Sequence, residues 1–162
     1  GKFMEISDHR RVDGGIIQGA EHTSLVLNHK QRHSYIISGV CRLRKNLHDF
    51  DAIACCGISG VIVAVQIAEL LNKEIVIVRK PQNSTLREYS EFIIEGVAPR
   101  RYVIVDDLVC SGKTVRYILN EIKEEYPRAI CVGMYSYMKE SCAYRNASDT
   151  FKKRFGIDYL NT

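Results

Sequence analysis

The hydrophobic positions of the chain follow two different spacings after an irregular start. Short runs rich in Val and Ile predict buried strands over residues 52–56, 74–78, 102–105 and 129–135. Between these runs, apolar residues recur at helical intervals over residues 34–47, 61–71 and 114–125. Because helices separate the strands, we expect an α/β fold with a mostly parallel sheet flanked by helices.

The ends of the predicted elements carry their own signals. Ser34 is placed to cap the first helix, and Pro127 follows the last one. Residues 1–30 are rich in glycine and have only weak apolar runs, so we predict loop with short strands there. Residues 136–162 carry aromatic side chains with little periodicity. We therefore expect one domain, 1–162, with a small irregular hood formed by the terminal segments.

The composition is that of an ordinary soluble domain. A chain of 162 residues, 46% of them hydrophobic and 26% charged, is long enough to bury roughly two thirds of its unfolded surface. No apolar run approaches the ~18 residues of a membrane span, and no signal-peptide pattern opens the chain, so a cytosolic protein is expected. Six cysteines without a CxxC pair fit reduced packing residues. The net charge of +4 favours a small polyanionic substrate over nucleic acid.

The most informative stretch covers residues 102–114. A hydrophobic strand ends in Asp106 and Asp107, and a loop of small and hydroxyl-bearing residues then opens a helix with Ser111, Gly112, Lys113 and Thr114. Backbone N–H groups at such a helix start bind phosphate, and glycine lets a ligand approach the backbone closely. The two carboxylates suit a ligand that also carries vicinal hydroxyls or a divalent cation. A Walker A motif is excluded, because Asp107 stands where that motif requires its first glycine.

A second turn of small residues follows the strand predicted at 52–56, and it consists of Gly57, Ile58, Ser59 and Gly60. Parallel neighbouring strands place both turns at one edge of the sheet, which suits a ligand with phosphate groups at both ends. Such turns are common in α/β proteins, so this one gains meaning only from the acidic pair. Arg79 and Lys80 close the next strand at the same edge, although adjacent basic residues also occur in solvated loops.

Residues 102–114 resemble the phosphoribosyl-pyrophosphate (PRPP) motif of type I phosphoribosyltransferases, which consists of a hydrophobic strand, two acidic residues and a loop ending in Ser/Thr-Gly-x-Thr. The resemblance implies an Mg²⁺-dependent enzyme that transfers ribose 5-phosphate from PRPP to a nucleobase and releases pyrophosphate. It implies that Asp106 and Asp107 are catalytic and hold the ribose hydroxyls, directly or through Mg²⁺. It also implies that Lys80 stabilises the leaving pyrophosphate.

The resemblance implies further substrate contacts. Residues 57–60 and Arg79 would contact pyrophosphate, and the loop 110–114, which begins with Cys110, would hold the 5'-phosphate. Residues 81–95 are similar in position to the mobile active-site loop of the family, which makes Arg87 and Tyr89 candidate substrate-binding residues. The alternative for these two residues is an exposed loop tip.

The acceptor base is indicated less clearly. Family members that act on hypoxanthine or guanine usually carry an aspartate where this chain has Cys110, and a thiol with a pKa near ~8.5 replaces a carboxylate poorly. Lys139 lies near the lysine with which xanthine-guanine enzymes read a 6-oxo group, whereas residues 79–81 are similar to adenine enzymes. We favour a purine. Candidate stacking residues, each of which also has an ordinary packing interpretation, are Tyr135, Tyr137, Phe151 and Phe155.

Two questions about partners stay open at this point. A non-catalytic regulator that senses PRPP would keep the same phosphate loop, and it is the alternative to an enzyme. Dimers are common in the family, and the N-terminal segment and the helix 34–47 offer a possible homodimer interface.

Overall fold

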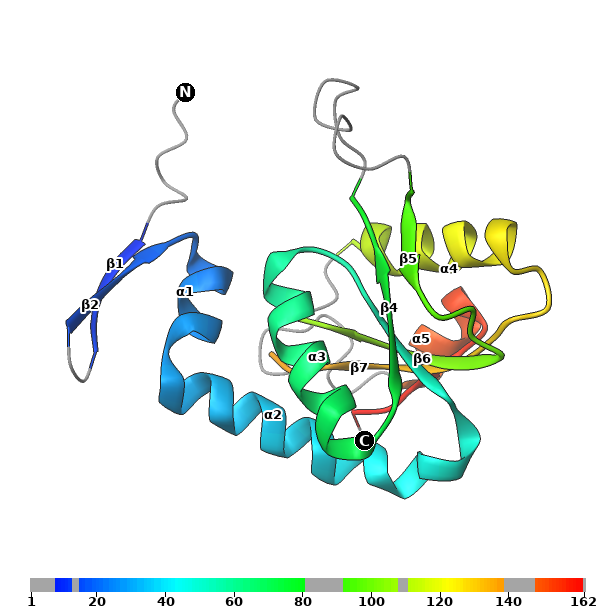
Figure 1. Ribbon diagram of the computed structural model, residues 1–162, viewed down its shortest axis with the longest axis horizontal. Helices are drawn as coiled ribbons and strands as arrows, with labels where there is room; N and C mark the ends of the chain where they lie inside the picture. The colour runs from blue at the N-terminus through cyan, green and yellow to red at the C-terminus, as the bar shows by residue number, and fades with distance from the viewer. Residues whose placement is uncertain (1–7, 13–14, 81–91, 108–110, 139–147, 162) are drawn as a thin grey trace.

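The computed structural model describes residues 8–12, 15–80, 92–107, 111–138 and 148–161 (Figure 1). Its core is a six-stranded sheet in the order β5-β4-β3-β6-β7-β8. All neighbouring strands are parallel except β5, which pairs antiparallel with β4 at one edge. The strands are β3 (Ala52–Cys55), β4 (Glu74–Val78), β5 (Ile94–Gly96), β6 (Arg101–Asp106), β7 (Ile130–Ser136) and β8 (Asp158–Tyr159). The mostly parallel α/β fold is therefore confirmed.

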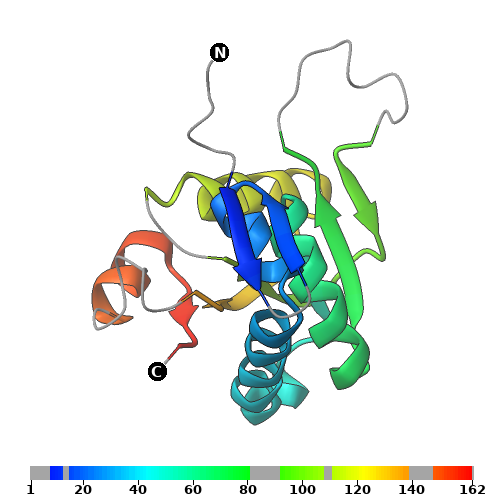
Figure 2. The same ribbon diagram turned by 90° about the vertical axis from the view of Figure 1, so that its left-hand side faces the viewer.

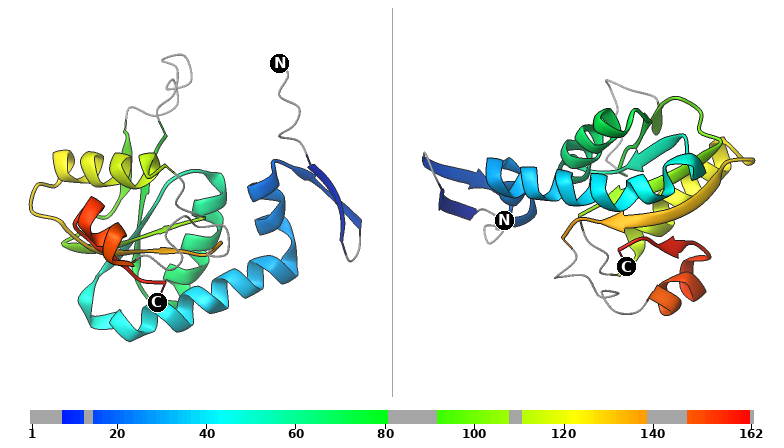
Figure 3. Two further views of the ribbon diagram at one scale, coloured as in Figure 1. Left: turned by 180° about the vertical axis from the view of Figure 1, so that it is seen from behind. Right: turned by 90° about the horizontal axis from the view of Figure 1, so that it is seen from below.

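Helices cover both faces of the sheet (Figure 3). On one face, α2 (His29–Leu43) and α3 (Ile58–Leu71) pack on Ile53 and Val103. On the other, α4 (Lys113–Glu125) and α5 (Ser148–Phe155) pack on Ala54 and Ile104. Since successive residues of a strand face opposite sides, both faces need apolar side chains, and this is why β3 and β6 are continuous hydrophobic runs. None of the helices in the described part of the chain has the length and hydrophobicity that a membrane span requires.

The first predicted helix begins earlier than expected. Its N-cap is Asn28, whose side-chain oxygen accepts a hydrogen bond from the Gln31 N–H at 3.0 Å, and Ser34 lies inside the helix. The prediction that Ser34 is the cap is wrong, because Asn28 has the extended backbone that a cap residue needs. A 3₁₀ segment, η2 (Arg44–Asp49), follows α2.

The N-terminal part is more regular than the sequence suggested. It forms an antiparallel hairpin of β1 (Asp8–Val12) and β2 (Gly15–Gly19), followed by α1 (Glu21–Leu27). The prediction of loop with short strands missed α1, where Val26 is fully buried beneath α2 and α3. Figure 1 shows the hairpin to one side of the main sheet, attached through α1, and Figure 2 views the molecule from that side, with the hairpin in front. Three further elements, β5, α5 and β8, were likewise missed in segments without clear periodicity.

Candidate functional site

The two turns noted in the sequence lie side by side. They follow β3 and β6, two parallel strands that pair directly with each other. Ala52 of β3 lies opposite Tyr102 of β6, and Ala54 lies opposite Ile104. The Ser59 hydroxyl donates a hydrogen bond to the Asp107 carboxylate, with 3.2 Å between Oγ and Oδ2. A Cβ atom added to Gly60 would lie 3.2 Å from Oδ1 of Asp106. The acidic pair thus packs directly against the first turn of α3.

A cavity of about 770 Å³ opens in front of this junction. Its wall combines the first turn, the end of β4, one residue of the acidic pair and the start of α1. The lining residues are Ala20, Thr23, Gly57, Ile58, Ser59, Val61, Ile62, Ile77, Val78, Arg79, Lys80, Glu95 and Asp107. The volume and the mixture of apolar walls with a few charged groups are those of a small-molecule site.

Lys80 lies against the backbone of the first turn. A Cβ atom added to Gly57 would lie 3.0 Å from Cε and 3.3 Å from Nζ of Lys80. Gly57 is also the N-cap of α3 and makes no side-chain capping bond, so the first N–H groups of α3 have no side-chain oxygen from the cap. An ammonium group beside a helix N-terminus makes this corner of the cavity favourable for an anion.

The acidic pair differs from this corner in charge and in burial. Asp106 is 5% exposed, and burial together with the neighbouring Asp107 raises the pKa of Asp106 well above its ordinary value, while Lys80 acts in the opposite direction. The backbone carbonyls of both residues are held, since Asp106 accepts from the Tyr137 N–H at 3.1 Å and Asp107 from the Met138 N–H at 2.8 Å. A ligand that brings hydroxyl donors or a cation to this pair relieves the repulsion between its carboxyl groups.

Asp106 and Asp107 fit Mg²⁺ only when a substrate supplies further ligands. Among the described residues, no three His, Cys, Asp or Glu side chains are grouped so that they could hold a metal ion by themselves. Mg²⁺ is usually bound by one or two carboxylates together with substrate phosphates and water. Asp106 and Asp107 match that pattern, with Asp107 on the cavity wall. They therefore suit a magnesium ion that arrives with a phosphate-bearing substrate.

The second turn is enclosed by the C-terminal helix. Gly112, the N-cap of α4, has a φ of 84°, and a Cβ atom there would lie 2.5 Å from Cζ of Phe155. The Arg154 guanidinium donates to the Ser111 carbonyl at 2.6 Å, and the Lys113 N–H donates to the Ser111 hydroxyl at 3.3 Å. Phe155 thus fills the space that a side chain at residue 112 would take, and close approach of a ligand to the Gly112 backbone stays a prediction. Glycine is needed here for the positive φ and for this packing.

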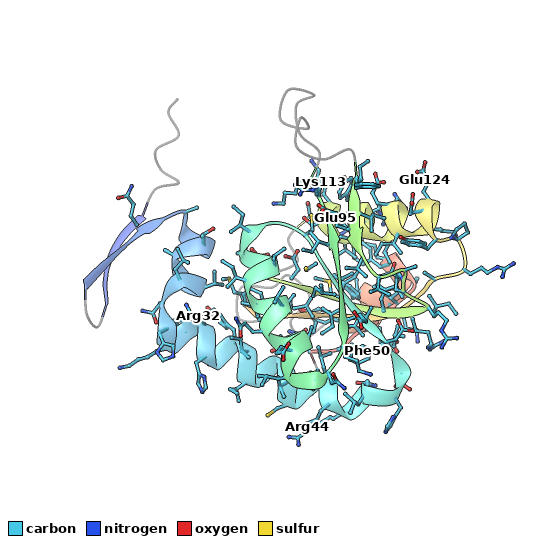
Figure 4. All side chains as sticks on the ribbon, in the orientation of Figure 1. Arg32, Arg44, Phe50, Glu95, Lys113 and Glu124 are labelled. Carbon is cyan, nitrogen blue, oxygen red and sulfur yellow. The ribbon has the colours of Figure 1, made fainter. Side chains whose placement is uncertain are left out.

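Several site residues were not found from the sequence. Glu95 on β5 forms an ion pair with Arg79 and lines the cavity, and Figure 4 labels its position. Thr23 and Ala20 line the cavity from the start of α1. The Tyr137 hydroxyl donates to the Ser59 carbonyl at 3.0 Å. Because each of these residues is distant in sequence from the turn or strand it meets, only strand pairing and packing bring it to the site.

Four predicted site residues, Arg87, Tyr89, Cys110 and Lys139, lie outside the described residues, so their roles stay predictions. The predicted stacking residues are described, and all four of them are buried. Tyr135, Tyr137 and Phe151 are each at most 2% exposed, and Phe155 is 9% exposed. None offers a free ring face to a base, so the prediction that they stack is wrong. These four side chains pack in the interior instead.

Known proteins with similar sequences indicate the family of this chain. A family model described as a phosphoribosyl transferase domain matches residues 31–160. The adenine phosphoribosyltransferase of Mycoplasma capricolum is 29% identical over 122 residues, covering 67% of this chain and 70% of that protein. The transcriptional regulator GfcR of Thermoplasma acidophilum is 27% identical over 106 residues, covering 64% of this chain and 53% of the regulator.

The fold is shared with solved structures. Orotate phosphoribosyltransferase from Aeropyrum pernix superposes with a TM-score of 0.63 at 13% identity, over 96% of this chain and 85% of that one. The match to the orotate phosphoribosyltransferase of Methanospirillum hungatei is 32% identical but spans only 46% of this chain and 42% of that protein. Because the family model covers most of the chain, including both turns and the acidic pair, the chain belongs to the phosphoribosyl transferase domain family.

Proposed function

We propose that the protein is an Mg²⁺-dependent phosphoribosyltransferase that transfers the ribose 5-phosphate of PRPP to a nucleobase and releases pyrophosphate. One observation carries the proposal. The N-terminal turn of α3 meets the acidic pair through the Ser59–Asp107 hydrogen bond, beside a cavity of about 770 Å³, and the N-terminal turn of α4 follows the pair along the chain. PRPP has the matching order of groups, with phosphate at both ends and ribose hydroxyls between them.

The first turn and Lys80 act on the leaving group. As the bond from the anomeric carbon to pyrophosphate lengthens, negative charge grows on the pyrophosphate oxygens. The N–H groups at the start of α3 and the Lys80 ammonium already face this position, so they stabilise that charge without reorganising. Bound Mg²⁺ supplies additional charge neutralisation at the pyrophosphate and ribose oxygens.

The acidic pair and the second turn act on the sugar. Asp107, on the cavity wall, and Asp106, behind it, accept hydrogen bonds from the ribose hydroxyls, and their negative charge favours the cationic character of the sugar in the transition state. The turn 111–114 binds the 5'-phosphate, which is remote from the breaking bond. Its contribution is therefore mainly to binding and alignment.

We propose a purine as the acceptor, and adenine before the others. Adenine phosphoribosyltransferases are among the relatives, and residues 79–81 are similar to that branch. Cys110 stands where hypoxanthine and guanine enzymes carry an aspartate, so we expect poor turnover of those two bases. Rapid turnover of either would show that the inference from Cys110 is wrong.

A screen of six bases tests the proposal directly. The purified chain is incubated with PRPP, Mg²⁺ and adenine, guanine, hypoxanthine, xanthine, orotate or uracil in turn, and pyrophosphate release is measured. We expect base-dependent release, fastest with adenine, and loss of release when EDTA removes Mg²⁺. No release with any base would overturn the assignment as a transferase.

A regulator that binds PRPP without turnover is the second candidate, and the match to the regulator GfcR is the observation that favours it. Calorimetry together with the base screen distinguishes the regulator from the enzyme, because a regulator binds PRPP yet releases no pyrophosphate in the base screen.

We also propose a homodimer that uses the N-terminal segment and α2. Light scattering that gives the mass of one 18.5 kDa chain at working concentration would refute the dimer.

A further inference from the structure

The second turn is supported from behind by α5, a helix about forty residues further along the chain. The Arg154 Nη2 atom donates to the Ser111 carbonyl at 2.6 Å, across a sequence separation of 43 residues. On the same helix, Phe155 occupies the space beside Gly112. The turn is therefore held at two successive residues by two successive residues of α5.

The support itself is fixed in place. The Phe155 ring packs on Phe151, with 4.8 Å between ring centroids, and Phe151 packs on Tyr159 of β8 at the same separation. Phe151 is fully buried. Aromatic pairs at this separation add stability beyond the area they bury. The Phe155 ring thus has little freedom to move away from Gly112.

Positive charge surrounds this ring. The Arg154 guanidinium lies over the Phe155 ring at 4.8 Å from its centroid, and the Arg116 guanidinium lies at 5.2 Å. Both arginine side chains are exposed, as is Lys113 in the first turn of α4. Stacking on an aromatic ring orders a guanidinium.

We propose that Arg154 is a positioning residue for the 5'-phosphate of the substrate. Its guanidinium holds the Ser111 carbonyl, which fixes the Ser111–Gly112 peptide plane and so directs the Gly112 N–H, at the N-terminus of α4, toward the phosphate. It also adds a positive charge beside that phosphate. This inference rests on the proposed function and concerns the 5'-phosphate half of that site alone.

The experiment compares Arg154→Ala and Arg154→Lys with a matched control, Lys153→Ala. Lys153 is exposed on the same helix, so its replacement removes the same charge without touching the turn. Calorimetry measures the affinity of each protein for ribose 5-phosphate and, separately, for Mg²⁺-pyrophosphate. The melting temperature of each variant is recorded alongside, and Arg154→Lys keeps the test valid if Arg154→Ala does not fold.

We expect Arg154→Ala to weaken ribose 5-phosphate binding about tenfold and Arg154→Lys to restore part of it, with pyrophosphate binding unchanged in both. Lys153→Ala should match the wild type. In turnover assays, the Arg154→Ala substitution should raise KM for PRPP and leave kcat near its original value.

Two results would overturn the inference. Equal ribose 5-phosphate affinity in Arg154→Ala and Lys153→Ala would show that Arg154 adds nothing specific. Parallel loss of ribose 5-phosphate and pyrophosphate affinity would show general damage rather than positioning. Failure of the proposed function gives a different pattern, since the wild type itself would then bind neither ligand and release no pyrophosphate from PRPP.

Discussion

The two helix N-terminal turns that follow β3 and β6 use glycine for different reasons. Gly57 and Gly112 both have positive φ, 82° and 84°, but their ψ angles are 160° and 3°. The first combination is almost restricted to glycine, while the second is the left-handed helical region that other residues enter at moderate cost. Behind Gly57 stands the movable end of Lys80, and behind Gly112 stands the packed ring of Phe155. The space beside the first glycine is thus taken by a charged group, and the space beside the second by a packed aromatic ring.

This difference suits the proposed chemistry. The pyrophosphate bound at the first turn gains negative charge as the bond breaks, so the Lys80 ammonium beside Gly57 is useful there. The 5'-phosphate at the second turn stays attached to the sugar throughout, so a rigid support lowers the cost of alignment. Glycine at the N-cap of both α3 and α4 therefore indicates a similar backbone turn, but the two turns have different proposed roles.

The largest effect on catalysis is expected from replacing the acidic pair. Replacing Asp106 and Asp107 together by Asn should lower kcat/KM for PRPP by about a thousandfold, because the ribose hydroxyls and the metal lose their carboxylates. The melting temperature should stay within a few degrees, since Asn keeps the shape and Asp106 is already buried at a raised pKa. Undiminished turnover in this variant would count decisively against the role of the pair.

Replacing Gly57 or Gly112 by alanine tests the comparison of the two turns through the free energy of unfolding. We expect Gly112→Ala to lower the free energy of unfolding by about 2–4 kcal/mol, from backbone strain and the clash with Phe155. Gly57→Ala should lower it by about 1–3 kcal/mol, from backbone strain alone. Urea unfolding measures both values.

Double-mutant cycles separate the two causes of destabilisation. Phe155→Leu should reduce the additional cost of Gly112→Ala, whereas Lys80→Ala should leave the cost of Gly57→Ala unchanged. If both cycles gave the same coupling, the two glycines would not differ as described.

A smaller effect is expected from Lys80→Ala. Loss of the ammonium beside Gly57 should weaken Mg²⁺-pyrophosphate binding about tenfold while ribose 5-phosphate binding remains, the reverse of the pattern for Arg154→Ala. Calorimetry with the two ligands checks this. Equal weakening of both would mean that the two halves of the site are not independent.

The smallest effect concerns thiol chemistry next to the first turn. Burial, and to a lesser extent Asp106, raises the pKa of Cys56 to about 11, whereas Cys41 is exposed on α2. At pH 8 the reactive thiolate of Cys56 is therefore scarce. Brief treatment with iodoacetamide and peptide mapping should show modification of Cys41 and protection of Cys56, with both modified after unfolding in urea. Equal rates in the native protein would contradict this view of the turn.

The sequence predicted the parts of the fold that are encoded locally. β3 and β6 are buried on both faces, and β4 is buried on one face and half-buried on the other, so their Val- and Ile-rich runs stand out without any tertiary information. The acidic pair and both turns follow such strands directly, which is why their position at one edge was predictable. By contrast, β5 and β8 are short edge strands whose pairing partners are set by the rest of the sheet.

The missed contacts share a physical cause. α5 has three basic residues in eight, and its two buried rings, Phe151 and Phe155, give too weak a helical pattern to recognise. The pairing of Arg79 with Glu95 depends on the antiparallel register of β4 and β5. Residues 25–27 lie in the segment 1–30 that was predicted to be loop with short strands, although they belong to α1, which packs with α2 and α3. Tertiary packing decides such segments more strongly than local preference does.

The hydrogen bonds from Tyr137 and Met138 to the carbonyls of Asp106 and Asp107 have a consequence for dynamics. These two amides should be among the slowest in the protein to exchange with deuterium, because they lie at the end of a buried strand pair. Any conformational closure around substrate must then come from the opposite wall, where α1 and the end of β4 line the cavity. We therefore expect the acidic side of the site to keep its position when a substrate binds.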